Sequence, residues 1–241
     1  MHSNGCVVIT GASSGIGAAI AREFGAGGYK VVAMARRSER LTELSIPAAH
    51  YCVVDLHNHE EAEVALREAE LACGPVGLLV NNAGVLRLAP VAEQSRSDLE
   101  EMFSVNCISA MSLTSLVLPG MMTRGRGTIV NIGSIAGHRT YEHHAGYCAT
   151  KSALHAFSEA TRKEAAPFGV RVITIAPGFV DTELGRDSPE TDITRAYSEH
   201  KMRLGGGLTA ELIARTVRSS YELPPDVCIR EIVIAPTAQI D

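Results

Sequence analysis

Tyr147 and Lys151 are the residues whose types and spacing most clearly suggest chemistry. They stand four positions apart, behind Ser134, and residues at i and i+4 lie on the same face of a helix. The Lys151 ammonium can therefore lie near the Tyr147 phenol and stabilise the phenolate, which lowers the tyrosine pKa from its ordinary value of about 10. A tyrosine of lowered pKa can give and take a proton at neutral pH. The pair predicts a tyrosine that acts as an acid and a base.

The same spacing occurs a second time, at Tyr197 and Lys201. This second copy has Leu184 at the upstream position where the first copy has Ser134, and it follows a stretch rich in Gly, Pro and Arg rather than a strand. Motifs this short also arise by chance. We interpret the second copy as a chance match.

A glycine-rich turn near the N-terminus predicts a site for a dinucleotide. The β-branched run 7–10 indicates a strand, 18–24 has a helical pattern, and the turn between them has the spacing G-x-x-x-G-x-G. Glycines let the backbone approach a pyrophosphate, and a helix N-terminus supplies amides and positive potential. An ordinary glycine-rich turn is the alternative. The turn residues expected at the cofactor are Gly11, Ser13, Ser14, Gly15, Ile16 and Gly17.

Strand-like and helix-like stretches alternate along the chain. The strand-like runs are 6–10, 30–35, 51–54, 78–81, 128–132, 170–175 and 229–235. The helical stretches are 15–26, 58–72, 98–122, 147–167 and 209–222. Alternation implies parallel βαβ units, and near-continuous apolar strands imply a sheet covered on both faces. We therefore expect a single α/β domain over 1–241, a doubly wound Rossmann fold with a parallel seven-stranded sheet.

The stretch at about 184–207 departs from this alternation. It contains five Gly or Pro residues with scattered charge, and it follows the sixth expected strand. In an open α/β sheet the ligand crevice lies beyond the carboxyl ends of the strands. We expect a lid or substrate loop here, and a surface loop without a role in binding is the alternative.

Composition and charge argue against several classes of protein. Apolar residues make up 46% of the chain and charged residues 20%, so the chain can bury a core. The net charge of -5, without a basic stripe, argues against nucleic acid as a partner. We find no apolar run of the roughly 20 residues that cross a bilayer, and the first strand begins too early to leave room for a signal peptide. We expect a cytoplasmic protein with no membrane partner.

The six cysteines are scattered, with no C-x-x-C pair and no histidine at ligand spacing. Most stand in apolar patterns, where a free cysteine is usually a small buried hydrophobe. Neither a metal site nor a disulfide framework is indicated. Cys148, beside Tyr147, is interpreted as a packing residue.

Together, these motifs resemble those of the short-chain dehydrogenases/reductases. The match, in family order and approximate spacing, comprises Thr10-Gly11-x-x-x-Gly15-x-Gly17, Asn81-Asn82-Ala83-Gly84, Asn106, Ser134, Tyr147-x-x-x-Lys151 and Pro177-Gly178-x-x-x-Thr182. It covers nearly the whole chain. The tail 231–239 is similar to the bacterial branch that includes NADP-dependent 3-hydroxy acid (serine) dehydrogenases and clavulanic acid dehydrogenase. The resemblance implies an oxidoreductase and a homo-oligomer, either a dimer or a tetramer.

The resemblance implies a role for each motif residue. Tyr147 exchanges a proton with the substrate oxygen, Ser134 hydrogen-bonds that oxygen, and Lys151 also contacts the nicotinamide ribose. Asn106 holds a water between Lys151 and solvent, although an asparagine in a helix is also a common kink or polar contact. The catalytic set is thus Asn106, Ser134, Tyr147 and Lys151. The further cofactor positions are Asp55 and Leu56 beside the adenine, then Asn82, Ala83, Gly84, Pro177, Gly178, Val180 and Thr182, the last at the nicotinamide carboxamide.

The end of the second expected strand predicts which cofactor is used. Enzymes that use NAD usually carry an acid there for the ribose 2′-hydroxyl, whereas arginine accommodates the 2′-phosphate of NADP. Here Ala35 takes the place of the acid, and Arg36 follows it directly. We expect NADP(H), with Ser13 and Arg37 as possible helpers. For Arg37 and Arg40, solvated charges at a helix start are the alternative.

The expected function is an NADP(H)-dependent oxidoreductase that transfers a hydride between the nicotinamide and a small carbonyl compound or secondary alcohol. The alternative from another class is a non-catalytic dinucleotide-binding regulator on the same fold, which would not need an intact serine, tyrosine and lysine. An epimerase or dehydratase would be longer, with other glycine spacing. The candidates for the substrate pocket are Leu86, Ile135, His138, Tyr141, His143, Phe179 and Leu184.

Overall fold

Seven parallel strands form the centre of the computed structural model, which describes residues 5–185 and 191–240. Their order across the sheet is β3-β2-β1-β4-β5-β6-β7. Strands β1 to β3 are added toward one edge and β4 to β7 toward the other, so the direction of strand addition reverses between β1 and β4. The strands are β1 (Cys6–Thr10), β2 (Val31–Ala35), β3 (His50–Val53), β4 (Val76–Asn81), β5 (Gly127–Ile132), β6 (Val170–Pro177) and β7 (Glu231–Ile234). This single α/β domain confirms the expected doubly wound sheet, with strand ends shifted by a few residues.

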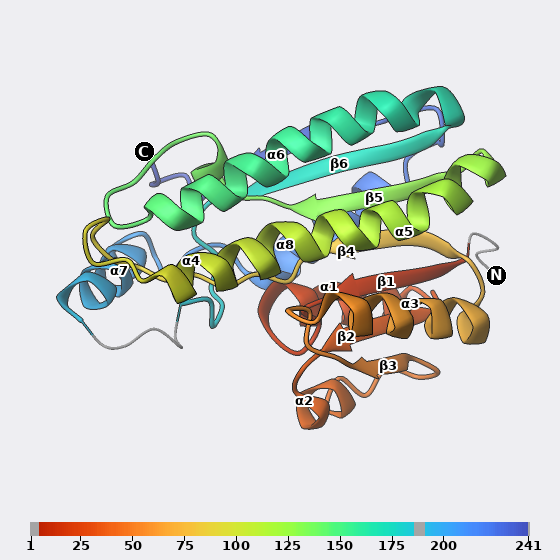
Figure 1. Cartoon of the computed structure of the whole chain (residues 1–241), viewed down its shortest axis with the longest axis horizontal. Coiled ribbons are helices and arrows are strands. Elements are labelled where there is room, and N and C mark those ends of the chain that lie inside the picture. The colour runs from red at the N-terminus through yellow and green to blue at the C-terminus, as the bar shows by residue number, and fades with distance from the viewer. Residues whose placement is uncertain (1–4, 186–190, 241) are drawn as a thin grey trace.

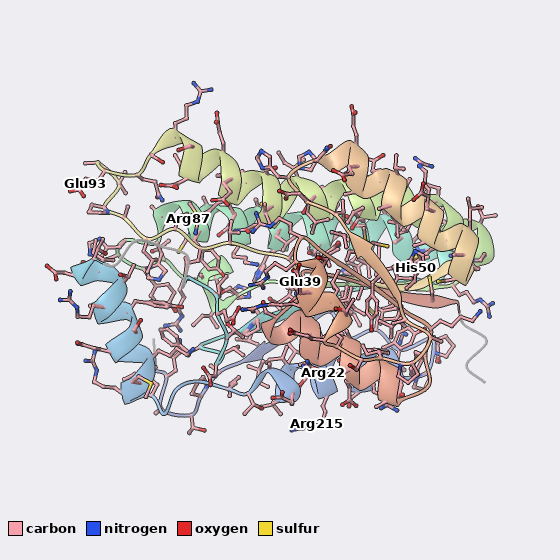
Figure 2. All side chains as sticks on the ribbon, turned by 90° about the horizontal axis from the view of Figure 1, so that it is seen from below. Arg22, Glu39, His50, Arg87, Glu93 and Arg215 are labelled. Atoms are coloured by element: carbon pink, nitrogen blue, oxygen red, sulfur yellow. The ribbon has the colours of Figure 1, made fainter. Side chains whose placement is uncertain are left out.

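Helices cover both faces of the sheet (Figure 1). One face carries α1 (Gly15–Ala26), α2 (Ser38–Thr42) and α8 (Ala210–Tyr221). The other carries α3 (His59–Cys73), α5 (Ser109–Arg124) and α6 (Ala145–Ala165). All five residues of β1 and of β2 are buried, because each strand has helices on both sides. Charged side chains such as Arg22, Glu39 and Arg215 lie on the outer faces of the helices (Figure 2).

The expected helix 98–122 is interrupted. The structure has α4 (Arg96–Phe103), a π-helical turn η1 (Ser104–Ile108) and then α5. The Ser95 side chain caps the start by accepting from the Asp98 amide, and Gly125 ends the helix in a left-handed conformation. A π-turn has the same hydrophobic pattern as an α-helix apart from one surplus residue, so periodicity did not reveal it.

The same segment corrects the expectation that no stretch is apolar enough to cross a membrane. By length and composition, the helical run 96–124 could do so. Half of its most apolar window is buried within the protein. Core helices of soluble proteins have this property too, so the run alone does not indicate a membrane protein.

Part of the expected lid is a helix, α7 (Asp192–Arg203). Thr191 caps it, accepting from the Thr194 amide at 3.2 Å while the Thr194 hydroxyl accepts from the Thr191 amide at 2.9 Å. The helix lies beyond the carboxyl ends of the strands (Figure 1). Residues 186–190 of the expected lid lie outside the described residues.

Candidate active site

A cleft of about 990 Å³ opens at the carboxyl edge of the sheet. The glycine-rich turn, the loops that follow β2 to β6, the first turn of α6 and one side of α7 line it. Of the residues expected to be catalytic or to bind the cofactor, all line this cleft except Gly17 and Asn106. Of the substrate-pocket candidates, His138 lies outside the lining, and the other six are part of it.

Ser134, Tyr147 and Lys151 meet at the inner part of the cleft. Tyr147 and Lys151 stand on the first turns of α6, and Ser134 follows β5 as the N-cap of a short 3-10 turn, where its hydroxyl accepts from the Ala136 amide at 3.1 Å. Ser134 also hydrogen-bonds the Tyr147 side chain. The Lys151 ammonium donates to the Ile132 carbonyl at 2.9 Å and lies 5.6 Å from the centre of the Tyr147 ring. The geometry joins a phenol, a hydroxyl and an ammonium at one point of the cleft.

Burial dominates the ionisation of this group. It raises the pKa of Tyr147 above its ordinary value, with smaller contributions in the same direction from Tyr197 and Cys148, while the Ser134 hydrogen bond opposes it. Burial also lowers the pKa of Lys151 to about 8. Burial therefore raises the Tyr147 pKa overall, so the predicted net lowering is wrong for the protein alone. Burial removes hydration from both side chains and so favours the neutral phenol and the neutral amine, and sequence spacing does not report that cost.

Asn106 is buried in the π-turn and supports the site from outside the cleft. Its side-chain oxygen accepts from the Val85 amide at 2.8 Å, and its nitrogen donates to the Val85 carbonyl at 3.0 Å and the Thr150 hydroxyl at 3.1 Å. These bonds tie the loop after β4 to α6 beside Lys151. The water-holding role implied by the family stays a prediction.

The glycine-rich turn lies so close to neighbouring backbone that side chains would not fit. A Cβ at Gly17 would collide with the Gly11 carbonyl, and one at Gly11 would lie 2.8 Å from the Ala83 Cα. Gly11 also has a φ of 66°, in the left-handed region that favours glycine. The turn therefore leaves open the space in front of the α1 N-terminus, where a phosphate group fits.

Arginines gather at the other end of the cleft. Arg37 donates to the Ser13 hydroxyl at 3.1 and 3.2 Å and to the Ser14 hydroxyl at 2.7 Å. Arg36 is more exposed and lies 3.9 Å from Asp55. Arg37, expected only as a helper, is thus the arginine that reaches the glycine-rich turn.

Sequence reasoning missed the acidic partner of these arginines. The Glu183 carboxylate lies 2.6 Å from Arg40 and 3.3 Å from Arg37, and both arginines hold its pKa below the ordinary value. Glu183 directly follows Thr182, which was expected at the cofactor, and this position was the sequence signal that could have placed Glu183 at the cleft. An anion that binds Arg37 here competes with Glu183.

The second Tyr-x-x-x-Lys copy lies in α7, on the lid side of the cleft. The Tyr197 ring packs 5.2 Å from Phe179 and 5.6 Å from His144, and burial raises its pKa to about 12. Lys201 points elsewhere, because its ammonium binds Asp181 at 3.1 Å. The copy therefore places a tyrosine in the pocket without the lysine beside it, and the pocket position of Tyr197 was not expected.

Comparisons with known proteins agree with this geometry. Residues 5–193 match the short chain dehydrogenase family. A sulfoacetaldehyde reductase from Chromohalobacter salexigens is 36% identical, over 97% of this chain and 94% of its own length. The closed form of serine dehydrogenase complexed with NADP+ superposes with a TM-score of 0.90 at 33% identity, covering 97% and 96% of the two chains. An alcohol dehydrogenase from Thermococcus sibiricus complexed with 5-hydroxy-NADP has a TM-score of 0.86 at 28% identity, over 98% of each chain.

The doubly wound sheet, the cleft at its carboxyl edge and the family match together define an oxidoreductase. The chain belongs to the short-chain dehydrogenase family. The family resemblance seen in the sequence motifs is thereby confirmed.

Proposed function

We propose that the protein is an NADP(H)-dependent oxidoreductase that interconverts a small carbonyl compound and its alcohol, with Tyr147 as the general acid and base. One observation carries the proposal: Ser134, Tyr147 and Lys151 converge inside a cleft whose far end is lined by Arg36 and Arg37. NADP(H), when bound, supplies or accepts the hydride. A non-catalytic regulator would have no use for the buried tyrosine and lysine.

The side chains of this chain handle the oxygen and its proton. In reduction, the Tyr147 hydroxyl donates its proton to the oxygen as negative charge develops there, and the Ser134 hydroxyl donates a second hydrogen bond to the same oxygen. The raised Tyr147 pKa keeps the phenol protonated at neutral pH, which suits a proton donor. The Lys151 cation stabilises the phenolate that remains. In oxidation the same groups act in reverse.

The residues present fit a dinucleotide with a 2′-phosphate. The turn at Gly11 to Gly17 and the α1 N-terminus would hold the pyrophosphate, and Arg36, Arg37 and Ser13 would hold the 2′-phosphate. Ala35 offers no carboxylate to an NAD ribose. Asp55, Leu56, Asn82, Ala83 and Gly84 would line the adenosine and ribose region, and Pro177, Gly178, Val180 and Thr182 the nicotinamide end. The solved neighbours that contain NADP or 5-hydroxy-NADP support this choice.

The proposal also covers the lid, the oligomeric state, the location and the class of substrate. The stretch at about 184–207 would cover the substrate, with Tyr197 and Phe179 as apolar walls and His143 and His144 as polar groups. We also propose that the protein is a homo-oligomer, either a dimer or a tetramer, and that it is cytoplasmic. Its binding partner would be a small carbonyl or alcohol substrate. The relatives named for sulfoacetaldehyde and serine suggest short polar substrates to include in an assay panel.

Cofactor choice tests the proposal directly. Charge-assisted hydrogen bonds are worth roughly 1.5–3 kcal/mol each, and Glu183 competes for Arg37, so we expect NADPH to bind about tenfold more tightly than NADH. Ala35→Asp combined with Arg36→Gln should invert this preference, because the carboxylate repels phosphate and accepts from a 2′-hydroxyl. Fluorescence titration of both cofactors measures the ratio, and absorbance at 340 nm with a carbonyl panel measures turnover. Equal or tighter binding of NADH by the native protein would contradict the assignment.

A further inference from the structure

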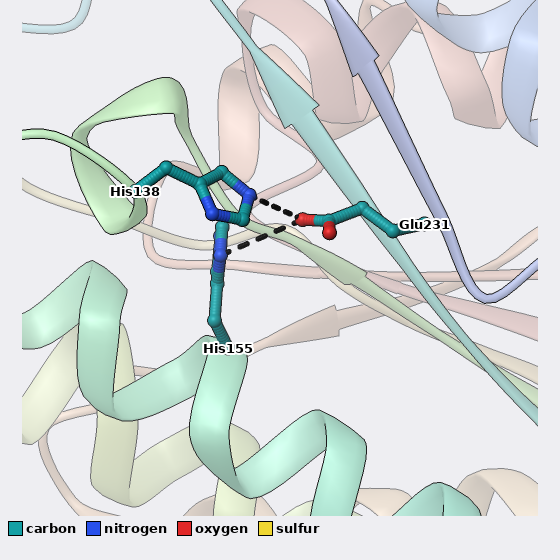
Figure 3. Close-up of side chains that lie close together, drawn as sticks. All are labelled: His138, His155 and Glu231. Atoms are coloured by element: carbon teal, nitrogen blue, oxygen red, sulfur yellow. Dashed lines mark hydrogen bonds and ion pairs between the residues drawn. The ribbon is translucent and has the colours of Figure 1, made fainter.

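His138, His155 and Glu231 form a cluster (Figure 3). The cluster lies next to Ser134, whose backbone N–H is hydrogen-bonded to His155. His138 follows the 3-10 turn after Ser134, His155 lies on α6 one turn beyond Lys151, and Glu231 begins β7. His138 Nε2 lies 2.6 Å from Glu231 Oε1, and His155 Nδ1 lies 3.6 Å from the same oxygen. The other ring nitrogen of His155, Nε2, accepts from the Ser134 backbone N–H at 3.3 Å.

The His155 ring is seated between two glycines of the serine segment. A Cβ at Gly133 would collide with His155 Nε2, and a Cβ at Gly137 would lie 2.6–2.8 Å from three ring atoms. The His155 side chain is 11% exposed. The ring therefore touches the backbone on both sides of Ser134, and any movement of the ring moves that backbone or loses contact with it.

The hydrogen bond to the Ser134 amide fixes which nitrogen of His155 carries the proton. A nitrogen that accepts has no proton, so the proton of the neutral ring is on Nδ1. Nδ1 lies 3.6 Å from the Glu231 carboxylate and has no hydrogen-bond partner among the described residues, so Glu231 acts on this proton through its charge. Burial lowers the His155 pKa to about 4; the neighbouring His138 and Lys151 act in the same direction and Glu231 opposes them. The ring is therefore neutral at pH 7, and Glu231 favours the tautomer that can accept from Ser134.

We infer that His155, oriented by Glu231, is a positioning residue: it holds the Ser134 backbone so that the serine hydroxyl faces Tyr147 and the substrate oxygen. Its effect on the rate rests on the proposed reductase function, whereas the hydrogen bond itself does not. His155 is not among the residues that line the cleft, so a substrate or cofactor bound there would not contact it directly. Its action passes through the main chain of Ser134.

The same three side chains could also be considered as metal ligands, because one ligand atom from each lies within 4.8 Å of the others. A metal on His155 Nδ1 would move the ring proton to Nε2. Two donors, Nε2–H and the Ser134 N–H, would then face each other. The hydrogen bond to Ser134 thus favours the positioning role over a metal site.

Two substitutions of His155 separate positioning from simple packing. His155→Phe keeps a ring but removes the acceptor, and we expect kcat to fall about 10- to 100-fold, since small displacements of a catalytic group have effects of this size. His155→Gln places an amide oxygen near the position of Nε2, and we expect kcat within about threefold of the native value. The NADPH dissociation constant should stay within about threefold in both variants, because the cofactor contacts are untouched. His50→Phe, at the start of the opposite edge strand β3, is the matched control and should leave kcat unchanged.

Glu231 can be tested through its dependence on His155. Glu231→Gln should lower kcat about threefold in the native background and have no further effect in the His155→Phe background, because the two residues act as a unit. A full effect of Glu231→Gln in both backgrounds would overturn the orienting role.

A spectroscopic measurement tests the hydrogen bond without any enzyme assay. Nitrogen-15 NMR of the His155 ring should show protonated Nδ1 and unprotonated Nε2 at pH 7, and zinc addition should leave these signals in place. An Nε2–H tautomer, or zinc binding that shifts the His155 signals, would overturn the inference. If the native protein reduces carbonyls and His155→Phe keeps full kcat, the positioning role fails while the proposed function stands. If no carbonyl is reduced, the proposed function fails and the NMR result alone decides on the hydrogen bond.

Discussion

Tyr147→Phe should lower kcat for carbonyl reduction by about 10²–10⁴-fold while NADPH binding is kept. General acid/base groups contribute this much to a rate, and the substitution removes only the phenolic proton donor. The Tyr147 ring is buried and packs with Leu86, Met102 and Ala136, so phenylalanine fills the same space. Steady-state kinetics with NADPH, together with cofactor titration by fluorescence, measures both quantities.

Tyr197→Phe is the matched control for this experiment, because it removes a hydroxyl from the other side of the same cleft. Lys201 binds Asp181 rather than Tyr197, so no cation supports proton transfer by Tyr197. We expect kcat within about threefold of the native value, with any change confined to KM. Near-native turnover of Tyr147→Phe, or a larger loss of turnover in Tyr197→Phe, would show that Tyr147 is not the proton donor.

Lys151→Met should lower kcat/KM for reduction about 100-fold or more, because the buried cation that stabilises the phenolate is lost. The pH profile gives the sharper test. With the Lys151 pKa lowered to about 8, the cation is present below that pH, so native activity should decline as the pH rises through about 8. The variant lacks this group, and its basic limb should move upward toward the raised pKa of Tyr147.

The pH–rate profile of Lys151→Met could also contradict this prediction. An unchanged basic limb would mean that another group titrates near pH 8 and that Lys151 has no electrostatic role. Thermal unfolding of the same variant separates a loss of stability from a loss of chemistry, since replacing a buried ammonium by an apolar chain of similar length removes a desolvation cost.

Local sequence signals predicted those parts of the fold and site that depend on chain order alone. A β-branched strand, a glycine-rich turn and a helix start come in sequence at residues 6–26, and the structure has β1 and α1 there. Tyr147 and Lys151 could be placed together because helix geometry brings i and i+4 to one face. The carboxyl ends of parallel strands share an edge, which brought Ser134 and the N-terminal turn to one cleft.

Other features depend on contacts between segments far apart in the chain. Helix α7 has no fully buried residue, and Tyr197 on it is only partly covered, so periodicity had no broad apolar face to find. The Thr191 and Thr194 capping pair was the usable signal. The pairing of Glu183 with Arg37 and Arg40 joins segments over 140 residues apart. The raised pKa of Tyr147 arises from the burial of the finished site, which spacing could not supply.

The π-helical turn η1 (Ser104–Ile108) also determines which sequence changes the long helical run 96–124 can accept without losing its contacts. An α-helix rotates by about 100° per residue, so the single surplus residue in this turn sets the angular phase between α4 and α5. The Asn106 amide can meet the Val85 backbone because that phase is correct. A replaced side chain in the turn alters its own contacts, whereas one residue gained or lost would rotate every side chain on one half of the helix relative to the other. This part of the chain is therefore constrained more by its length than by its composition.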